Sequence, residues 1–353
     1  MPDEHNESSL RVYAETLSPA EVAGHAGLLR RFGCDVVLAV RPFHLLAVPR
    51  AVRALEDAGV RVALWPMIED EKGRWPSVKN ADAWVAFAEE VLRVLEEARA
   101  PLREVLFDLE PPFGSVRALT PGHFSPAALV RMARRSRHAH GRAALVSFRR
   151  ALSQRGITVS AAIVPLCVFA PRWERVLGTP VTAVDADLPS VMAYTTIYEG
   201  WSRGIFSRSD ALTLLSVTAR HTVAAYGARA GISLGTVGTG AFEDEPIYRS
   251  PDELRADVMV ARQAGVQRLT LFDLGGVVRR GPPEAWLEAF SEARSSRSSP
   301  PRATGPTVQN YGVPIAESNR MRLFRCSIEG RWSAIDGGAE SCNLSKTSLR
   351  RPE

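Results

Sequence analysis

Between residues 10 and 293, short apolar runs alternate with longer stretches of mixed apolar and polar residues. Short apolar runs bounded by turn residues are typical of buried strands, and repeats of three to four residues are typical of helices. Strands are predicted at Leu10–Ala14, Asp35–Val40, Arg61–Trp65, Glu104–Leu109, Thr158–Val164, Ser190–Tyr194, Gly231–Thr236 and Arg268–Phe272. Helices are predicted at Pro49–Asp57, Ala81–Ala98, Pro126–Arg155 (as one helix, or as two broken near Gly141), Ser209–Tyr226, Pro251–Ala264 and Pro283–Ala293.

Eight strands alternating with helices over about 285 residues predict a single (β/α)8 TIM barrel, residues 10–293. A doubly wound open sheet is the main alternative, and it would show a glycine fingerprint after the first strand. The first strand instead runs into Glu15-Thr16-Leu17-Ser18-Pro19, and the chain has neither a GxGxxG motif nor a P-loop. The barrel is therefore the favoured fold.

The composition changes after Glu292, where Ser, Arg and Pro become frequent. Such a segment can bury little apolar surface, so we predict that residues 294–353 form a disordered tail. This tail has ten Lys and Arg against five Asp and Glu, a surplus of five that equals the net charge of +5 of the whole chain. The barrel is therefore formally neutral, and no nucleic acid partner is expected.

Four cysteines lie at positions 34, 167, 326 and 342 without a CxxC spacing, so neither a zinc site nor a disulfide framework is indicated. Cys34 and Cys167 lie in apolar runs and are predicted to be buried thiols. No apolar run reaches the roughly 18 residues that span a bilayer, and residues 1–9 do not resemble a signal peptide. We expect a cytoplasmic protein without a membrane partner, unless translation begins further upstream. No oligomeric state is predicted.

Two acids end the fourth predicted strand. Asp108 and Glu110 are two residues apart after the apolar run Val105–Phe107, and Pro111 and Pro112 follow. Residues i and i+2 of a strand point to the same face, so the two carboxylates are expected to lie side by side. The alternative is a solvated loop start, where Asp, Glu and Pro are common.

The ends of the other strands add acids and aromatic residues, and active sites of such barrels lie at these ends. The candidates are Glu15, Arg41, Trp65, Glu69, Asp70, Tyr194, Tyr198, Glu199, Trp201, Glu243, Asp244 and Asp273. Histidine is scarce there, with only His44 and His123 nearby, which disfavours a metal-dependent enzyme. No GxSxG elbow is present, which disfavours a serine hydrolase triad. No cofactor is expected.

Carboxylates beside aromatic rings are typical of glycosidases. Aromatic faces stack on sugar rings, one carboxylic acid protonates the glycosidic oxygen, and a second acid or the substrate itself stabilises the oxocarbenium-like centre. Two carboxylates on one strand face also repel each other, which raises the pKa of one of them. A carbohydrate substrate is therefore the expected partner.

The segment from Arg103 to Glu110 resembles the DxxDxDxE motif of glycoside hydrolase family 18, the chitinase-like barrels. Only the terminal DxE is kept, because Arg103 and Leu106 occupy the first two Asp positions. Met192-Ala193-Tyr194 matches the Met-x-Tyr that the family has on its sixth strand, and Ser233–Thr236 resembles the small residues of its seventh. Phe272-Asp273 replaces the family's tryptophan on the eighth strand.

The resemblance implies that Glu110 is the general acid/base. Asp108 would orient Glu110 and an N-acetyl group of the substrate, and Tyr194 would hydrogen-bond that group. Without the two upstream acids, the resemblance implies either a slow enzyme or a substrate that lacks the N-acetyl group. The residues predicted to bind substrate are Trp65, Glu15, Arg41, Tyr198, Trp201 and Asp273. For Arg41, an ion pair with Glu15 is favoured over a contact with a substrate oxygen.

Two other functions stay open. The sequence Leu109-Glu110-Pro111 faintly resembles the Asn-Glu-Pro of retaining glycosidases, whose nucleophile comes from strand 7; Glu243, Glu199 or Asp273 would then be the second carboxylate. A non-catalytic carbohydrate-binding barrel is the other alternative, although the presence of Glu110 favours catalysis. Trp65 is predicted to stack on substrate or to pack, Met192 to lie in the core, and Trp75, Trp84, Trp173 and Trp286 to pack in helices or loops.

Overall fold

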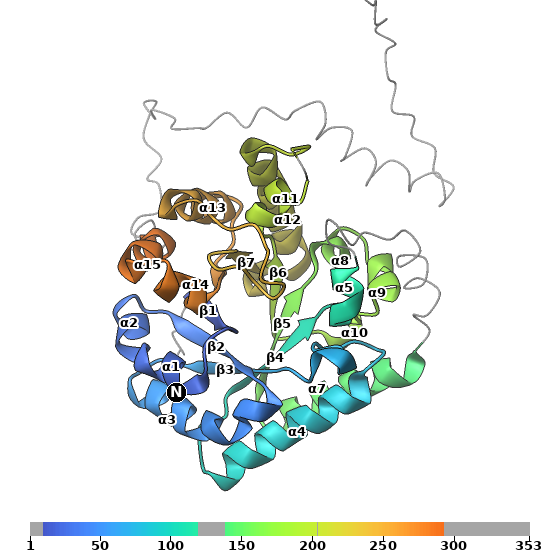
Figure 1. Cartoon of the computed structure of the whole chain (residues 1–353). Helices are drawn as coiled ribbons and strands as arrows, with labels where there is room; N and C mark the ends of the chain where they lie inside the picture. Colours follow the sequence, from blue (N-terminus) through green and yellow to red (C-terminus); the bar gives the residue numbers. More distant parts are fainter. Residues whose placement is uncertain (1–9, 119–137, 203, 293–353) are drawn as a thin grey trace, which may run out of the picture. The chain divides into compact units, whose positions relative to one another are not determined.

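The computed structural model describes residues 10–118, 138–202 and 204–292. Within these ranges eight parallel strands close into a barrel in chain order, and β1 pairs with both β2 and β8 (Figure 1). The strands are β1 (Leu10–Ala14), β2 (Asp35–Val40), β3 (Val62–Pro66), β4 (Glu104–Leu109), β5 (Thr158–Ile163), β6 (Leu188–Met192), β7 (Gly231–Gly235) and β8 (Arg268–Phe272). The predicted (β/α)8 fold is confirmed.

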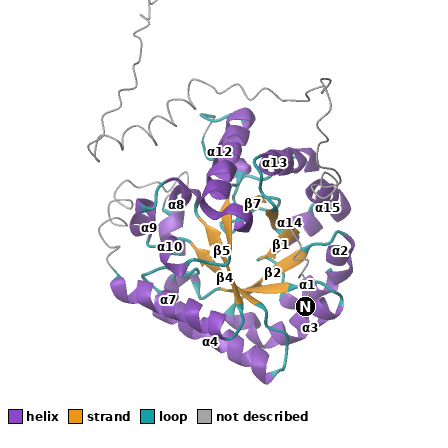
Figure 2. Ribbon diagram, turned by 180° about the vertical axis from the view of Figure 1, so that it is seen from behind, coloured by secondary structure: helices purple, strands orange, loops and turns teal. Residues whose placement is uncertain are grey.

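Helices surround the barrel, and Figure 2 shows them outside the strands from the opposite side. They are α1 (Pro19–Gly24), α2 (Ala26–Arg31), α3 (Val48–Asp57), α4 (Ala81–Glu97), α5 (Phe113–Arg117), α7 (Ala139–Gln154), α8 (Pro165–Phe169), α9 (Arg172–Leu177), α10 (Val181–Val184), α11 (Thr195–Gly200), α12 (Arg208–Tyr226), α13 (Pro251–Gln263), α14 (Leu274–Arg279) and α15 (Pro283–Ser291). Short 3-10 helices η1 (Pro42–Ala47), η2 (Asp70–Lys72) and η3 (Gly227–Arg229) complete the described elements.

Strand β4 shows how the alternation of side chains builds two cores. Phe107 faces outward, with its ring centroid 4.9 Å from that of Trp84 in α4. Leu106 belongs instead to the buried cluster inside the barrel, and Asp108 lines the cavity above it. Because neighbouring strand residues point to opposite faces, the acids of the DxE motif face the barrel interior.

The barrel interior is filled below the cavity, toward the amino ends of the strands. Arg11 donates two hydrogen bonds of 2.6 and 2.7 Å to Glu104. The Tyr13 hydroxyl lies 3.1 Å from the hydroxyl of Ser233, and Leu106 is 2% exposed. These side chains form a packed floor, so the cavity above them opens toward the carboxyl ends of the strands.

Several details differ from the sequence prediction. Strand β6 begins and ends two residues earlier than predicted, because Tyr194 is already the N-cap of α11, and the bounds of β3, β5 and β7 differ by one residue. The short helices α1, α2, α5, α8, α9, α10, α11 and α14 were not predicted; a capping box between Ser18 and Glu21 begins α1. Gly141 lies inside α7, where a Cβ atom would come within 2.0 Å of the Val78 carbonyl oxygen, so it permits close packing and does not break the helix.

Residues 126–137 of one predicted helix, His123 and the predicted disordered tail lie outside the described residues. Cys34 and Cys167 are buried free thiols, as predicted. In the ranges that the structure describes, no helix combines the length and apolar character needed to cross a membrane.

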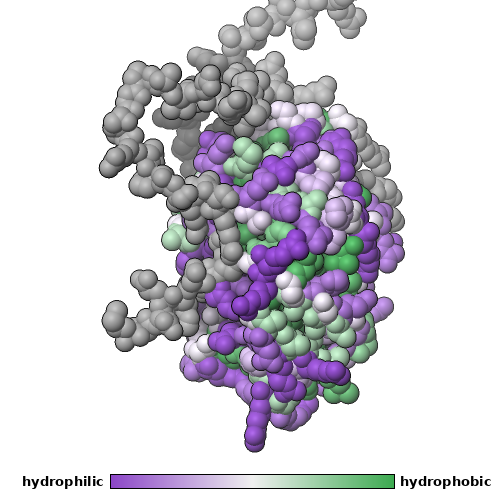
Figure 3. All heavy atoms as spheres, turned by 90° about the vertical axis from the view of Figure 1, so that its left-hand side faces the viewer, coloured by the Kyte–Doolittle hydropathy of each residue, from purple (hydrophilic) through white to green (hydrophobic). Residues whose placement is uncertain are grey.

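The surface mixes polar and apolar residues. Figure 3 shows hydrophilic side chains interspersed with smaller hydrophobic areas on one face of the molecule. The large hydrophobic side chains that are exposed are Phe43, Leu46, Ile205 and Met259. Single exposed apolar side chains of this kind are normal on a folded domain.

Candidate active site

A cavity of about 230 Å³ lies at the carboxyl ends of the strands. Seven residues that the sequence analysis proposed line it together: Glu15, Trp65, Asp108, Glu110, Tyr194, Tyr198 and Trp201. They come from β1, β3, β4 and the segment from β6 into α11, so the closed barrel brings together residues that are far apart in the sequence. Tyr13, Trp75, Met192, Phe242, Glu245 and Phe272 also line the cavity, although the sequence analysis gave them no site role.

Asp108, which is buried, and Glu110, which is half-buried, form an acidic pair. Glu110 directly follows β4, and its backbone N–H donates a 2.9 Å hydrogen bond to the Asp108 carbonyl oxygen, which bends the chain at the strand end. Burial raises the pKa of Glu110 to about 7, with Glu15 adding to the rise and Asp108 and Arg74 opposing it. Burial and the neighbouring Glu110 raise the pKa of Asp108 well above its usual range. The pair therefore holds a proton near neutral pH.

Some polar atoms of the cavity wall are left without a partner. Asp108 is 2% exposed, and its Oδ1 makes no hydrogen bond within the described part of the chain. The same holds for the indole Nε1 atoms of Trp65 and Trp75. Trp65 is near enough to lower the pKa of Asp108, but the two groups do not form a hydrogen bond of normal geometry. Unpaired buried polar atoms are costly, and the three residues that carry them all line the cavity.

Arg74, from the loop after η2, holds Glu15 in place. Its guanidinium is 2.9 Å from Glu15 and 2.7 Å from Asp70, and it lies 3.9 Å from the centroid of the Phe113 ring. Burial nevertheless raises the pKa of Glu15 to about 7. Arg41 pairs with Asp70 at 3.0 Å, so the expected ion pair between Arg41 and Glu15 is wrong: Arg74 takes that place. Arg41 lies outside the cavity lining, in a separate surface hollow.

Asp273 also lies outside the cavity lining. It is the N-cap of α14, and its carboxylate accepts hydrogen bonds of 2.9 Å from the Gly276 N–H and the Thr16 hydroxyl. These bonds give Asp273 a structural role in fixing α14 against β1. Glu199 forms an ion pair with Arg249 at 3.0 Å and is not a cavity-lining residue either.

Glu245 is the acid that the loop after β7 places in the cavity, and the sequence analysis had considered only its neighbours Glu243 and Asp244. The pKa of Glu245 is raised to about 8, mainly by burial and also by Glu15 and Glu110, while hydrogen bonds from the backbone N–H groups of residues 241 and 242 oppose the rise. Gly240 in the same loop has φ +72°, and a Cβ atom there would lie 1.8 Å from a carboxylate oxygen of Glu245. The glycine therefore leaves room for the acid.

Aromatic rings form a continuous wall around these acids. The Tyr13 ring is 5.2 Å from Trp65 and 5.7 Å from Phe272, and Phe272 is 5.8 Å from Tyr194. On the other side, Phe242 stacks on Phe113 at 4.9 Å and lies 6.5 Å from Trp201. Trp75 and Met192, predicted to pack, line the cavity, whereas Trp84 and Trp286 are buried in the outer core as predicted.

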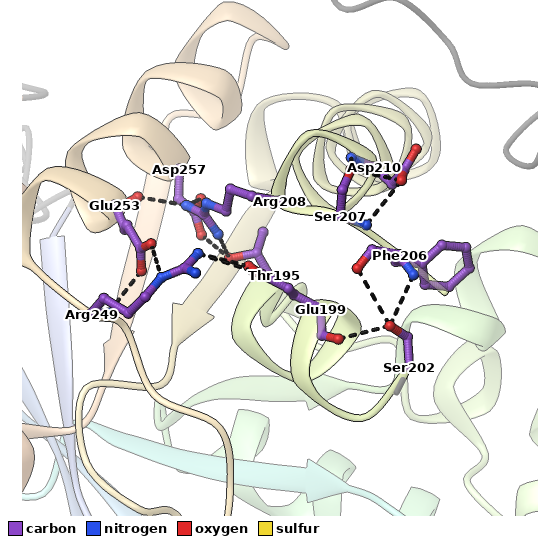
Figure 4. A network of polar contacts seen from close by, with 10 residues as sticks. All are labelled: Thr195, Glu199, Ser202, Phe206, Ser207, Arg208, Asp210, Arg249, Glu253 and Asp257. Carbon is purple, nitrogen blue, oxygen red and sulfur yellow. Dashed lines mark hydrogen bonds and ion pairs between the residues drawn. The ribbon is translucent and has the colours of Figure 1, made fainter. Parts of the chain in front are cut away.

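Figure 4 shows a network of polar contacts that includes Thr195 of α11, Arg208 of α12 and Asp257 of α13. Asp257 in α13 is fully buried and accepts hydrogen bonds from Thr195 at 2.5 Å and from Tyr248 at 2.6 Å. Arg208 in α12 donates to Asp257 at 2.5 Å and to Thr195 at 2.6 Å. Burial raises the pKa of Asp257 to about 6, although Arg208 lowers it. The network joins α11, which supplies Tyr198 to the cavity, to the loop that contains Glu245.

No family model matches the chain, and no curated protein matches it. Solved structures match over most of the barrel. An endoglucanase from Clostridium longisporum has a TM-score of 0.50 at 9% identity, covering 82% of this chain and 97% of the other. A chitinase catalytic domain from Ostrinia furnacalis has a TM-score of 0.49 at 11% identity, covering 84% and 98%. The PgaB glycoside hydrolase domain from Bordetella bronchiseptica has a TM-score of 0.47 at 13% identity, covering 80% and 98%.

Sugar epimerases also match at similar levels. The chain is thus structurally similar to chitinases and other glycoside hydrolase barrels, a distant resemblance that the sequence analysis predicted. At these identities the likeness is one of fold, and fold by itself does not define an activity.

Proposed function

We propose that this protein is a glycoside hydrolase in which Glu110 is the general acid/base. The main support is the Asp108–Glu110 pair at the carboxyl ends of the strands, with Asp108 buried and Glu110 half-buried, inside a cavity with aromatic walls. Burial raises the pKa of Glu110 to about 7, so its carboxyl group keeps a proton near neutral pH. A protonated acid beside aromatic sugar-stacking surfaces is what glycosidic bond cleavage requires.

The proposed reaction has two steps. Glu110 donates its proton to the glycosidic oxygen while the bond from that oxygen to the anomeric carbon breaks, and positive charge develops on the anomeric carbon and ring oxygen. Asp108 in its ionised form, or an acyl oxygen of the substrate, stabilises that charge. Glu110, now a carboxylate, then removes a proton from a water molecule that attacks the anomeric carbon, which restores the acid. Tyr194, on the opposite wall, is placed to donate a hydrogen bond to a substituent of the sugar.

The two motif positions that differ from the chitinase-like pattern bear on Asp108. Arg103 lies at the foot of the barrel, where it pairs with Glu56 at 3.1 Å. Leu106 is buried in the barrel interior on the same face of β4 as Asp108. The next acid down this face of β4, Glu104, is paired with Arg11 at 2.6 Å. Asp108 therefore has Glu110 as its neighbouring acid on this face, and burial together with Glu110 favours a protonated Asp108. A protonated Asp108 is a weaker partner for a developing positive charge, which supports a slow enzyme or a substrate without an N-acetyl group.

A second candidate is a two-carboxylate retaining glycosidase. The observation that favours it is Glu245, which lines the same cavity as Glu110 from the loop after β7. In this mechanism a carboxylate attacks the anomeric carbon and forms a covalent intermediate. A 2-deoxy-2-fluoro glycoside would label Glu245 by mass spectrometry in the two-carboxylate mechanism. A substrate-assisted enzyme would leave Glu245 unlabelled and would be inhibited by a thiazoline analogue of the N-acetyl sugar.

Hydrolysis of chromogenic glycosides and of chitooligosaccharides tests the proposed function. Wild type, Glu110→Gln and the control Asp244→Asn are compared. Asp244 is exposed in the loop after β7, and Asp244→Asn also replaces a carboxylate by an amide. Loss of the acid is expected to reduce kcat by about 10² to 10⁴-fold, and the control should retain full activity. Equal activity in wild type and Glu110→Gln would overturn the role of Glu110. Binding of glycans without any turnover would favour the carbohydrate-binding barrel.

A further inference from the structure

The charged side chains that line the cavity are all acidic. Among the described lining residues, Glu15, Asp108, Glu110 and Glu245 are the charged ones, and they come from three different parts of the barrel. Arg74 is the cation next to them, and it is already shared between Glu15 and Asp70 at 2.9 and 2.7 Å. A neutral sugar in this cavity would offer no positive charge to those carboxylates that are ionised.

The cavity wall is suited to a cation in a second, independent way. The faces and edges of Tyr13, Trp65, Trp75, Tyr194 and Phe242 surround the acids. Aromatic rings attract an ammonium group through their quadrupoles, and the attraction is strongest where water is excluded. Asp108 Oδ1, in a side chain that is 2% exposed, has no hydrogen-bond partner within the described residues, so a donor is missing on this wall.

We propose that the substrate is an amino sugar with a free, protonated amino group, and that Glu245 is the residue that binds this ammonium, with Asp108 Oδ1 as a further acceptor. This inference rests on the proposed glycoside hydrolase function and specifies its substrate class. An ammonium group has three donors and a full positive charge, which suits a cavity whose charged lining residues are all acidic. An N-acetylated sugar offers one neutral N–H in the same place.

The protonation of the empty cavity agrees with such a ligand. Glu15, Glu110 and Glu245 have pKa values raised to about 7, 7 and 8 by burial and by one another. Protons therefore relieve the repulsion when no ligand is present. A bound ammonium would replace one of these protons, so binding should release protons into the buffer.

Binding to catalytically impaired Glu110→Gln separates recognition from turnover. A fully deacetylated glucosamine tetramer and its fully N-acetylated counterpart are titrated by calorimetry at pH 7, in two buffers of different ionisation enthalpy. The free amine form is expected to bind at least about tenfold more tightly and to release protons. Adding Glu245→Gln should remove this preference without weakening binding of the N-acetylated tetramer, and adding Asp244→Asn should change neither.

Glu245→Asp is the second variant, because it keeps the charge and should keep part of the preference for the amine. Circular dichroism and thermal unfolding establish that each variant is folded. Equal or tighter binding of the N-acetylated tetramer, together with its hydrolysis by wild type, would overturn the amine inference and leave the hydrolase proposal intact. Tighter binding of the amine form without any turnover would support the inference as a binding property and overturn the hydrolase proposal.

Discussion

Arg74 donates a 2.9 Å hydrogen bond to Glu15, and this bond connects the loop after β3 to the end of β1 across the mouth of the barrel. Both side chains are about nine-tenths buried, with 10% and 9% of their side-chain surface exposed. Removing one partner of a buried ion pair is costly, because the remaining charge has lost its partner and stays desolvated. The pair therefore fixes two walls of the cavity and sets the charge that Glu15 presents to a ligand.

Replacement of Arg74 by Met should destabilise the protein by about 3 kcal/mol or more, because Glu15 and Asp70 would both lose a buried cation. Urea unfolding measures this loss. The double variant with Glu15→Gln should recover part of it, since the uncharged amide no longer needs the cation. Lys72→Met is the control, because Lys72 is 59% exposed in its pair with Glu69 and should change stability by less than about 1 kcal/mol. Equal losses for Arg74→Met and Lys72→Met would contradict the structural role of Arg74.

The acid cluster predicts that stability falls as pH rises. Glu15, Glu110 and Glu245 have folded-state pKa values of about 7, 7 and 8, above the ordinary value of 4.5. A raised pKa in a carboxyl group means that the folded state binds its proton more tightly than the unfolded state does. The contribution of these three acids to the free energy of unfolding is complete below pH 4.5 and is lost as pH rises toward 8.

Glu245→Gln tests this pH dependence. It should leave the free energy of unfolding unchanged near pH 4.5 and raise it at pH 8 by about 1 kcal/mol or more, because each unit of pKa difference corresponds to about 1.4 kcal/mol. Denaturant titrations from pH 4.5 to 8.5 measure the difference. A constant offset between wild type and variant across this range would rule out the titration of Glu245 as the cause.

The pH profile of hydrolysis should fall on its alkaline side. Glu110 must be protonated to donate to the glycosidic oxygen, and its pKa is raised to about 7, so kcat/KM should decline above pH 7. Arg74→Met should shift this decline to higher pH, because Arg74 lowers the pKa of Glu110. A profile that keeps rising through pH 9 would be incompatible with Glu110 as the acid.

Asp257 is expected to support the cavity wall from a distance. Asp257→Asn should cost about 3 kcal/mol, because it removes the charge that Arg208 and two hydroxyl groups share in a fully buried position. KM should rise more than kcat falls, since α11 and the loop containing Glu245 lose their common anchor. Arg249→Ala is the control: it breaks the ion pairs with Glu199 and Glu253, in which the arginine is 65% exposed, and its effect should stay below about 1 kcal/mol.

Gly240→Ala should weaken amine binding. The backbone at Gly240 has φ +72°, and the added methyl group would meet the carboxylate of Glu245 at 1.8 Å. Gly204→Ala is the control, since Gly204 has φ +81° and its Cβ would meet nothing within 4 Å. Both changes should cost about 1 kcal/mol of stability from the left-handed backbone. Only Gly240→Ala should also reduce the affinity for the deacetylated tetramer, as measured by calorimetry.

The sequence predicted those parts of the molecule that local periodicity determines. The bounds of β4 and the shared face of Asp108 and Glu110 follow from the two-residue period of a strand. Glu245 was missed because it lies in an irregular loop with two neighbouring acids, where no period indicates which side chain turns inward. Arg74 was missed because its partners are distant in sequence, and ion pairs of this kind depend on tertiary packing.

The spacing of Gly240 and Glu245 provides a marker for recognising related proteins. A side chain five positions earlier would meet the Glu245 carboxylate where it now lies, so the two positions are expected to change together during evolution. Chains with the DxE segment and this glycine–glutamate spacing should share the same ligand preference. Chains with DxE and a bulkier residue at the glycine position should have lost the acid, and with it the selectivity for a cation.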